Sequence, residues 1–210
     1  MSIVTIRGQL GSGAPEIGRL VADKLNTDYV DREIIAEVAE RLKWSKQGIA
    51  EKELPPATLG GRILEALGRS GADQGVYLPA WEIPPDDPLY LAGLESVIKE
   101  LAGSGSFVIR GRGSQFILRD FPDAFHVLVV APLALRVKRI MEDMQLDDKA
   151  ATKEVERFDS SRREFTKRYF HAELEDPLNY DLVINTQRLI FEDAASIIVN
   201  ICSQYFPFER

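Results

Sequence analysis

The sequence predicts an α/β fold, a doubly wound parallel sheet of five strands with helices on both faces, and three observations predict it. Five short apolar segments alternate with segments of helical periodicity. Some of these strands are nearly continuous apolar runs, which is typical of strands covered on both faces. The length of 210 residues suits one substantial domain with its own core.

The first unit is expected to be a strand, a glycine loop and a helix. A strand is predicted for residues 2–8, SIVTIRG, because β-branched residues are followed at once by glycines. A helix should then open at Pro15, which suits a first turn because its missing N–H would have no partner there. Apolar residues continue at helical spacing, at Ile17, Leu20, Val21, Ala22 and Leu25.

The other elements follow in the same alternation. Further strands are expected around Tyr29 and Val30 and within residues 106–110, 125–132 and 181–186. Helices are expected within residues 89–105, closed by Gly103, within a long charged region at 133–170, and within 189–206.

The glycine loop comes close to a phosphate-binding loop but lacks its cation. The P-loop pattern is GxxxxGK[ST], and Gly8 and Gly13 have the right spacing. Ala14 stands where lysine belongs, and Pro15 where Ser or Thr belongs. The loop is weakened rather than abolished, because its glycines still let the backbone turn inward and a helix N-terminus still favours an anion.

Polar residues gather where the predicted strands end. Ligands of doubly wound sheets bind at the carboxyl ends of the strands. The loop at 8–13, Asp31 and the segment 110–113 all lie there. Two alternatives stay open: Asp31 alone is more often a helix cap, and Arg110 can turn outward at its strand end.

Composition excludes some function classes. The net charge of −7 speaks against a dedicated nucleic-acid binder, because such binding relies on accumulated basic residues. One cysteine, Cys202, excludes an internal disulfide, and no apolar run approaches a membrane span, so we expect a cytoplasmic protein without a membrane partner.

His126 and His171 form neither a metal site nor a triad by spacing and are expected to be structural.

Several dispersed segments carry a family resemblance. They are GSGAPEIG, YVDREII, VIRGRGSQFIL, APLALRVKRI, FDSSR and NYDLVINT. Together they resemble the cytidylate kinase-like family, a branch of the P-loop nucleoside monophosphate kinases, in order and over nearly the whole chain. The resemblance implies one P-loop kinase-like domain over residues 1–210, with an acceptor-side helical insert and flap near 44–90 and a lid near 133–170.

The resemblance also implies a reaction and its residues. ATP, with Mg²⁺ expected, would transfer its γ-phosphoryl group to a nucleoside monophosphate, CMP or dCMP being the acceptor we expect. The donor triphosphate would be wrapped by Gly8, Gly11, Ser12, Gly13 and Ala14. The acceptor would lie near Asp31, Arg32 and Asp159, and its phosphate would be gripped by Arg112. Lid arginines would complete the catalytic set, namely Arg136, Arg139 and Arg162. Guanidinium forks suit phosphate oxygens, and phosphoryl transfer needs mainly positioning and charge neutralisation.

The sequence departs from the family pattern at both loops. Cytidylate kinases tend to carry aspartates where Arg110 and Gly113 stand here, which removes a carboxylate for the metal. Ser12 and Glu16 are the remaining candidates for a metal ligand, and neither is favoured. An arginine is expected to replace the missing lysine.

Four arginines compete for that replacement, and nothing in the sequence selects among them. Arg7 and Arg19 lie beside the loop, whereas Arg136 and Arg139 belong to the lid. Lid arginines can instead pair with acids such as Glu142 or Asp159.

Two other functions remain open. The departures at both loops favour, as an alternative, a nucleotide-binding or regulatory protein that keeps the kinase fold without transfer. A kinase for another small hydroxyl or phosphate acceptor is a third reading, because a fold alone does not determine a substrate. Oligomeric state and base preference cannot be read from these patterns.

Overall fold

The structure, a computed structural model, describes residues 2–31 and 88–205. These residues form a sheet of five parallel strands in the order β2-β3-β1-β4-β5. The predicted doubly wound α/β sheet is therefore confirmed. The strands are β1 Ile3–Gly8, β2 Asp28–Val30, β3 Phe107–Arg110, β4 Ala124–Val130 and β5 Leu182–Asn185.

The register brings the ends of the central strands to one edge. Ile6 of β1 lies opposite Arg110 of β3 and Val127 of β4. The segments that follow β1 and β3 consequently emerge side by side, as expected for parallel strands. This edge is where the polar segments identified in the sequence come together.

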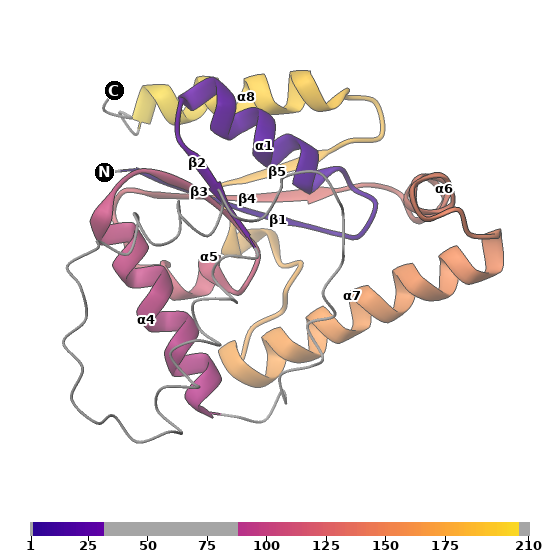
Figure 1. The fold of residues 1–210 in the computed structure, drawn as a ribbon, viewed down its shortest axis with the longest axis horizontal. Coiled ribbons are helices and arrows are strands. Elements are labelled where there is room, and N and C mark those ends of the chain that lie inside the picture. The colour runs from indigo at the N-terminus through magenta and orange to yellow at the C-terminus, as the bar shows by residue number, and fades with distance from the viewer. Residues whose placement is uncertain (1, 32–87, 206–210) are drawn as a thin grey trace, which may run out of the picture.

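Helices cover both faces of the sheet (Figure 1). Helices α1 and α8 lie on one face, and α4 and α5 lie on the other. Their bounds are α1 Ala14–Leu25, α4 Pro88–Ser104, α5 Ser114–Ile117, α6 Leu133–Met144, α7 Asp148–Phe170 and α8 Phe191–Tyr205, with a short 3₁₀ helix, η1, at Pro177–Asn179.

One expectation about the helices needs correction, and another gains detail. Helix α4 does not close at Gly103 but continues to Ser104. The charged region at 133–170 is helical as expected and divides into two helices, because Gln145 adopts a left-handed conformation with φ 55° that ends α6. Asp147 then begins α7, its carboxylate accepting a hydrogen bond from the Ala150 N–H at 2.7 Å.

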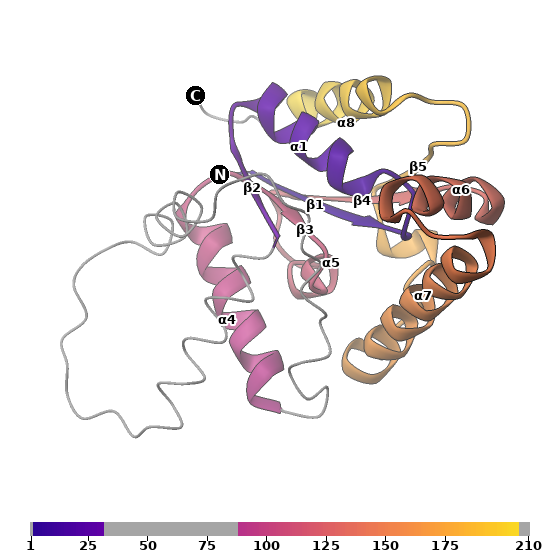
Figure 2. The same ribbon diagram turned by 45° about the vertical axis from the view of Figure 1, so that its right-hand side comes forward.

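Three apolar clusters hold the layers together. One lies between the sheet and α4 and includes Ile3, Leu94 and Ile98. A second lies between the sheet and helices α1 and α8, with Ile17 among its fully buried members. The third joins α6, α7 and Leu10 of the glycine loop. Figure 2 shows α6 and α7 beside the end of the sheet where that loop lies.

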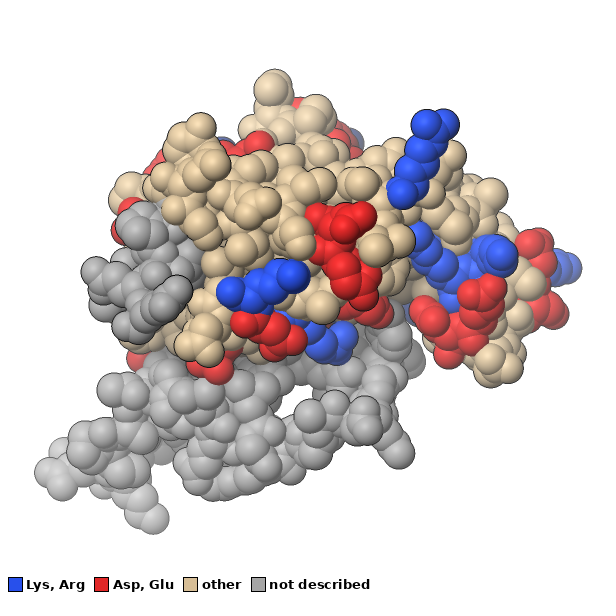
Figure 3. All heavy atoms as spheres, turned by 90° about the horizontal axis from the view of Figure 1, so that it is seen from above, with Lys and Arg blue, Asp and Glu red and all other residues tan. Residues whose placement is uncertain are grey.

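Some sequence predictions fall outside the described residues. Arg32 and nearly all of the predicted insert and flap at 44–90 lie there, so the domain assignments stay predictions. None of the helices within 2–31 and 88–205 combines the length and apolar character needed to cross a membrane. On the face seen in Figure 3, basic and acidic side chains lie close to one another rather than forming a continuous basic surface.

Candidate functional site

The glycine loop between β1 and α1 has a backbone that requires glycine at two positions. Gly11 and Gly13 have φ values of 77° and 88°, in the left-handed region that other residues rarely adopt. Space is also lacking: a Cβ at Gly11 would lie 2.6 Å from the Arg136 carbonyl oxygen, and one at Gly13 would lie 2.2 Å from the Phe191 ring. The predicted tight turn is present and is held against α6 and the start of α8.

The two positions that depart from the P-loop pattern form the first turn of α1. Ala14 is buried, and a Cβ on Gly8 would lie 2.2 Å from the Ala14 Cβ, so the loop closes tightly on itself. Pro15 follows in the first turn, where its missing N–H breaks no hydrogen bond. Neither side chain brings a charge, so the anion preference of this turn comes from the helix N-terminus alone.

The segment after β3 holds an arginine in an unusual conformation. Gly111, Arg112 and Gly113 have φ values of 69°, 60° and 71°, three left-handed residues in succession. A non-glycine residue in this region costs on the order of 1–3 kcal/mol, and away from helix ends such residues cluster at functional sites. A Cβ at Gly113 would lie 2.4 Å from the Phe170 ring, so α7 packs directly on this turn.

Asp31 joins the ends of β2 and β3 through two ion pairs. Its Oδ2 accepts from the Arg110 Nε at 2.9 Å, and its Oδ1 lies 3.6 Å from an Arg112 terminal nitrogen. All three side chains are less than a quarter exposed. Arg110 therefore does not turn outward. Asp31 holds two guanidinium groups side by side, a pairing that sequence reasoning did not anticipate.

These groups line one cavity of about 80 Å³. The glycine loop contributes the stretch from Gly8 to Gly11 and Ala14, and Asp31 also lines the cavity. Four arginines line the same cavity, namely Arg7, Arg110, Arg112 and Arg162. The structure thus brings together the glycine loop and two of the four arginines assigned to catalysis, Arg112 and Arg162. The cavity combines backbone suited to phosphate with a concentration of guanidinium groups.

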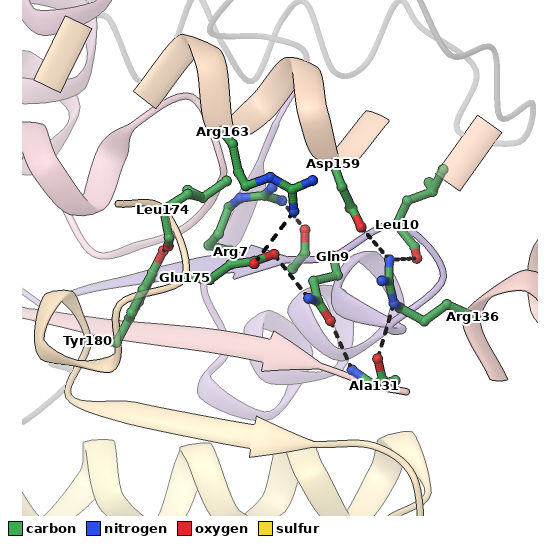
Figure 4. A network of polar contacts seen from close by, with 11 residues as sticks. Arg7, Gln9, Leu10, Ala131, Arg136, Asp159, Arg163, Leu174, Glu175 and Tyr180 are labelled. Atoms are coloured by element: carbon green, nitrogen blue, oxygen red, sulfur yellow. Dashed lines mark hydrogen bonds and ion pairs between the residues drawn. The ribbon is translucent and has the colours of Figure 1, made fainter. Parts of the chain in front are cut away.

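Arg136 and Asp159 lie outside this cavity's lining and contact each other (Figure 4). The Arg136 guanidinium lies 2.8 Å from the Asp159 carboxylate, and both side chains are less than 8% exposed. Arg136 also donates to the carbonyl oxygens of Ala131 at 3.1 Å and Leu10 at 3.3 Å. The open alternative of pairing with Asp159 is what the structure shows. The pair ties α6 and α7 to the glycine loop.

Arg139 supports the loop from α6. It donates to the Gly11 carbonyl at 3.0 Å and to the hydroxyl and carbonyl oxygens of Thr186 at 3.0 and 3.1 Å. Its guanidinium also lies over the Phe191 ring, 5.0 Å from the centroid. Thr186, almost fully buried, donates in turn to the Ser12 carbonyl at 2.8 Å. Sequence reasoning missed Thr186, although its place just after the last strand is the signal that marked other edge residues.

A second network, also missed, links the loop to the segment after α7. Gln9 donates to Glu175 at 3.0 Å and accepts from the Ala131 N–H at 3.2 Å. Glu175 also lies 3.7 Å from Arg163. Gln9 is a variable position of the P-loop pattern, so the motif carries no signal for it. Figure 4 shows how these side chains connect the loop with α7.

The remaining candidates are easily placed. Arg19 lies over the Tyr29 ring, 5.4 Å from its centroid, and is absent from the cavity lining. Arg162 lines the cavity while lying over the Phe158 ring at 4.9 Å. His126 is a core residue whose Nδ1 is 2.7 Å from the Thr5 hydroxyl, and burial lowers the pKa of His126 below its ordinary value.

The two candidates for a metal ligand, Ser12 and Glu16, do not line the cavity. Ser12 is fully buried, its Oγ has no hydrogen-bond partner among the described residues, and it does not line the cavity. Glu16 is exposed and does not line it either. Within the described ranges no group of three or more His, Cys, Asp or Glu side chains is placed to hold a metal ion.

Comparison with known sequences gives a family for this arrangement. The sequence profile of the cytidylate kinase-like family matches residues 3–188, which confirms the resemblance carried by the dispersed motifs. A cytidylate kinase from Staphylothermus marinus is 27% identical over 199 residues, 94% of each chain. One from Halobacterium salinarum is 23% identical over 205 residues, 97% of this chain and 90% of that enzyme. A uronate isomerase from Corynebacterium glutamicum is 29% identical over 106 residues, but these are only 20% of that enzyme.

Solved structures support the fold. A protein of unknown function from Eubacterium ventriosum superposes with a TM-score of 0.70 at 18% identity, covering 97% of this chain and 99% of that one. Shikimate kinase from Bacteroides thetaiotaomicron gives 0.51 at 12% identity, covering 96% and 98%. At these identities the likeness shows the fold alone, and it is that of the P-loop kinases.

Proposed function

Because the chain belongs to the cytidylate kinase-like family, we propose that it transfers the γ-phosphoryl group of ATP to a nucleoside monophosphate, CMP or dCMP. An oxygen of the acceptor phosphate attacks the γ-phosphorus. The bond from that phosphorus to the β–γ bridging oxygen breaks, and ADP and a nucleoside diphosphate result. The observation that carries the proposal is one cavity lined by both the glycine loop and four arginines.

The donor side of the cavity is assigned to the glycine loop. The segment from Gly8 to Ala14 would enclose the triphosphate, with the N-terminus of α1 favouring its negative charge. Arg139 and Thr186 hold the loop in place through its carbonyl oxygens. Their role is to position the loop, because Arg139 donates to a backbone oxygen and to Thr186 rather than into the cavity.

The acceptor side is assigned to the turn after β3. Arg112 would bind the acceptor phosphate, because its left-handed backbone places it in the cavity lining beside Asp31. Arg162 would reach the same anion from α7. Asp31 orients Arg110 and Arg112, so that several fixed guanidinium groups meet the charge that develops on the moving group. The acceptor roles of Arg32 and Asp159 remain predictions.

Magnesium would arrive bound to the phosphates of ATP rather than being held by a dedicated protein site. Mg²⁺ keeps several waters and takes ligands from substrate phosphates, so metal dependence does not require a dedicated protein site. Neither Ser12 nor Glu16 lines the cavity.

A direct assay tests the proposal. The protein is incubated with ATP, Mg²⁺ and, separately, CMP, dCMP, UMP, AMP and GMP, and ADP formation is followed together with the new diphosphate. We expect the highest kcat/KM with CMP or dCMP. Shikimate serves as a hydroxyl acceptor outside the nucleotide class. Turnover with shikimate but no monophosphate would overturn the acceptor assignment.

The regulatory alternative is favoured by the departures at Ala14, Pro15, Arg110 and Gly113. It predicts ATP binding, seen as thermal stabilisation, without ADP formation on any acceptor. The same assay combined with a melting curve in ATP separates the two functions.

A further inference from the structure

We propose that Arg7 supplies the cation that Ala14 lacks and binds the terminal phosphates of the donor nucleotide. The inference rests on the proposed function only in placing the donor triphosphate at the glycine loop. It goes further by assigning a residue of β1, outside the loop pattern itself, to the task that lysine performs in that pattern.

Arg7 lies in the right place for this task. It is the residue before Gly8, at the carboxyl end of β1, and it lines the cavity together with Gly8, Gly11 and Ala14. Its terminal nitrogen donates a hydrogen bond to the Gly8 carbonyl oxygen, which holds the guanidinium against the loop. Figure 4 places the side chain between the sheet edge and α7.

Arg7 is a partly buried cation without an acidic partner among the described residues. Among the described residues, no carboxylate lies within ion-pair distance of it. Burial is the largest influence on its guanidinium and lowers the pKa of Arg7, the Arg110 charge adding to that effect. A charge withdrawn from water without a carboxylate partner is costly to a folded protein. A cation of this kind that lines a cavity is a candidate for binding an anion there.

The acids that surround Arg7 are already engaged. Asp159 pairs with Arg136 at 2.8 Å, and Asp31 pairs with Arg110 and Arg112. Glu175 accepts from Gln9 at 3.0 Å. Asp159 and Glu175 attract Arg7 from a distance, and Asp31 lines the same cavity. Each of these three carboxylates is therefore held by another group. Among residues 2–31 and 88–205, none of these carboxylates is left to pair with Arg7, which leaves its guanidinium available to an anionic ligand.

The other candidates for the lysine role are placed elsewhere. Arg19 lies over Tyr29, away from the cavity. Arg136 is engaged by Asp159 and by two carbonyl oxygens, and Arg139 by Gly11 and Thr186. The structure thus selects one of four residues between which the sequence did not discriminate. A guanidinium can also contact two phosphate oxygens at once, whereas an ammonium acts as a point charge.

Binding measurements test the assignment without requiring turnover. Affinities of Arg7→Met and Arg7→Lys proteins are measured by calorimetry for a non-hydrolysable ATP analogue, for inorganic tripolyphosphate and for CMP. We expect Arg7→Met to weaken the first two by about 10- to 100-fold, the worth of a charge-assisted hydrogen bond, and CMP by less than about twofold. Arg19→Met is the matched control and should leave all three affinities unchanged.

The melting temperature separates a ligand role from a structural one. Methionine keeps much of the stem and removes the unpaired charge, so the ligand-free Arg7→Met protein should melt at the same temperature as the wild type or higher. The additional stabilisation by the ATP analogue should be lost. A lower melting temperature with unchanged triphosphate affinity would overturn the proposal.

A rescue experiment gives a second, independent test. Ala14→Lys in the Arg7→Met background should recover at least tenfold in tripolyphosphate affinity, because it returns a cation to the same phosphates. Should Arg7→Met not fold, Arg7→Lys carries the test, with triphosphate affinity lowered about three- to tenfold and CMP affinity retained. Unchanged affinity in that protein rejects the assignment. Triphosphate binding that depends on Arg7, without ADP formation on any acceptor, refutes the proposed kinase function while the Arg7 assignment stands.

Discussion

Two groups of arginines lie near the glycine loop, and they differ in what their guanidinium groups contact. Arg136 and Arg139, on α6, direct their donors at carbonyl oxygens, a hydroxyl and one carboxylate of the protein. Arg7 and Arg112, at the strand ends, line the cavity. Residue type and proximity to the loop are shared, so neither distinguishes a structural arginine from a ligand-binding one. The difference lies in position. Arg7 and Arg112 line the cavity while also contacting the Gly8 carbonyl oxygen and Asp31, whereas Arg136 and Arg139 do not line it.

Removing an arginine should have a different consequence in each group. Loss of an α6 arginine should lower stability, because a carboxylate or carbonyl oxygens lose their partner in the interior. Loss of a cavity arginine should lower ligand affinity or turnover with little effect on folding. The following predictions test that separation.

The largest effect is expected from the buried ion pair. Arg136→Ala leaves the Asp159 carboxylate buried without its partner and should lower the free energy of unfolding by about 3–5 kcal/mol. Denaturant titration measures this. The double variant Arg136→Met with Asp159→Leu should lose less than Arg136→Ala, because no unpaired charge remains. A loss below about 1 kcal/mol for Arg136→Ala would show that the pair contributes little to holding α6 and α7 together.

The next effect concerns acceptor use. Arg112→Ala should lower kcat/KM for the monophosphate by at least about 100-fold, near 2.7 kcal/mol, because a phosphate contact made at the transition state is lost. Steady-state kinetics with varied CMP measures it. Arg119→Ala is the matched control, since Arg119 is exposed on the same segment and lies over Phe116 outside the cavity. Unchanged turnover in Arg112→Ala would reject the acceptor assignment.

A smaller gain is expected from restoring the loop pattern. Ala14→Lys with Pro15→Thr should raise kcat/KM for ATP by about three- to tenfold, because it adds a cation and a hydroxyl at the positions where P-loops carry them. If Arg7 already neutralises the same phosphates, the gain should be larger in the Arg7→Met background than in the wild type. Equal gains in the two backgrounds would indicate that the two positions act independently.

The smallest expected effect is a pH dependence of the free energy of unfolding. It comes from His126, which belongs to neither group of arginines. Burial lowers the pKa of His126, and the nearby charge of Arg119 lowers it further. Asp181 and the hydrogen bond with the Leu118 backbone offset part of this shift. The folded state therefore binds fewer protons than the unfolded chain near pH 6.5, and stability should fall as pH decreases through that range. Unfolding titrations at pH 7.5 and 5.5 measure this. His126→Gln should reduce the difference, whereas His171→Gln, at an exposed helix end, should not.

The sequence by itself determined the fold and the edge at which the site lies. Buried apolar runs that alternate with amphipathic segments admit few arrangements other than a doubly wound parallel sheet, whose strand ends share one edge. The local backbone was also readable, because glycines at Gly11 and Gly13 and a proline at Pro15 have few compatible conformations. The boundary between α6 and α7 was missed, since a non-glycine residue ends α6.

Only the tertiary structure decided which arginine faces the cavity. The acid that engages Arg136 is 23 residues away in sequence, and the one that engages Arg110 is 79 residues away. A long side chain with several rotatable bonds takes the direction in which its charge finds a partner, and such partners are brought together by packing rather than by spacing along the chain. Packing also separates Arg7 from Arg19. Arg7 lines the cavity, whereas the Arg19 guanidinium lies over the Tyr29 ring.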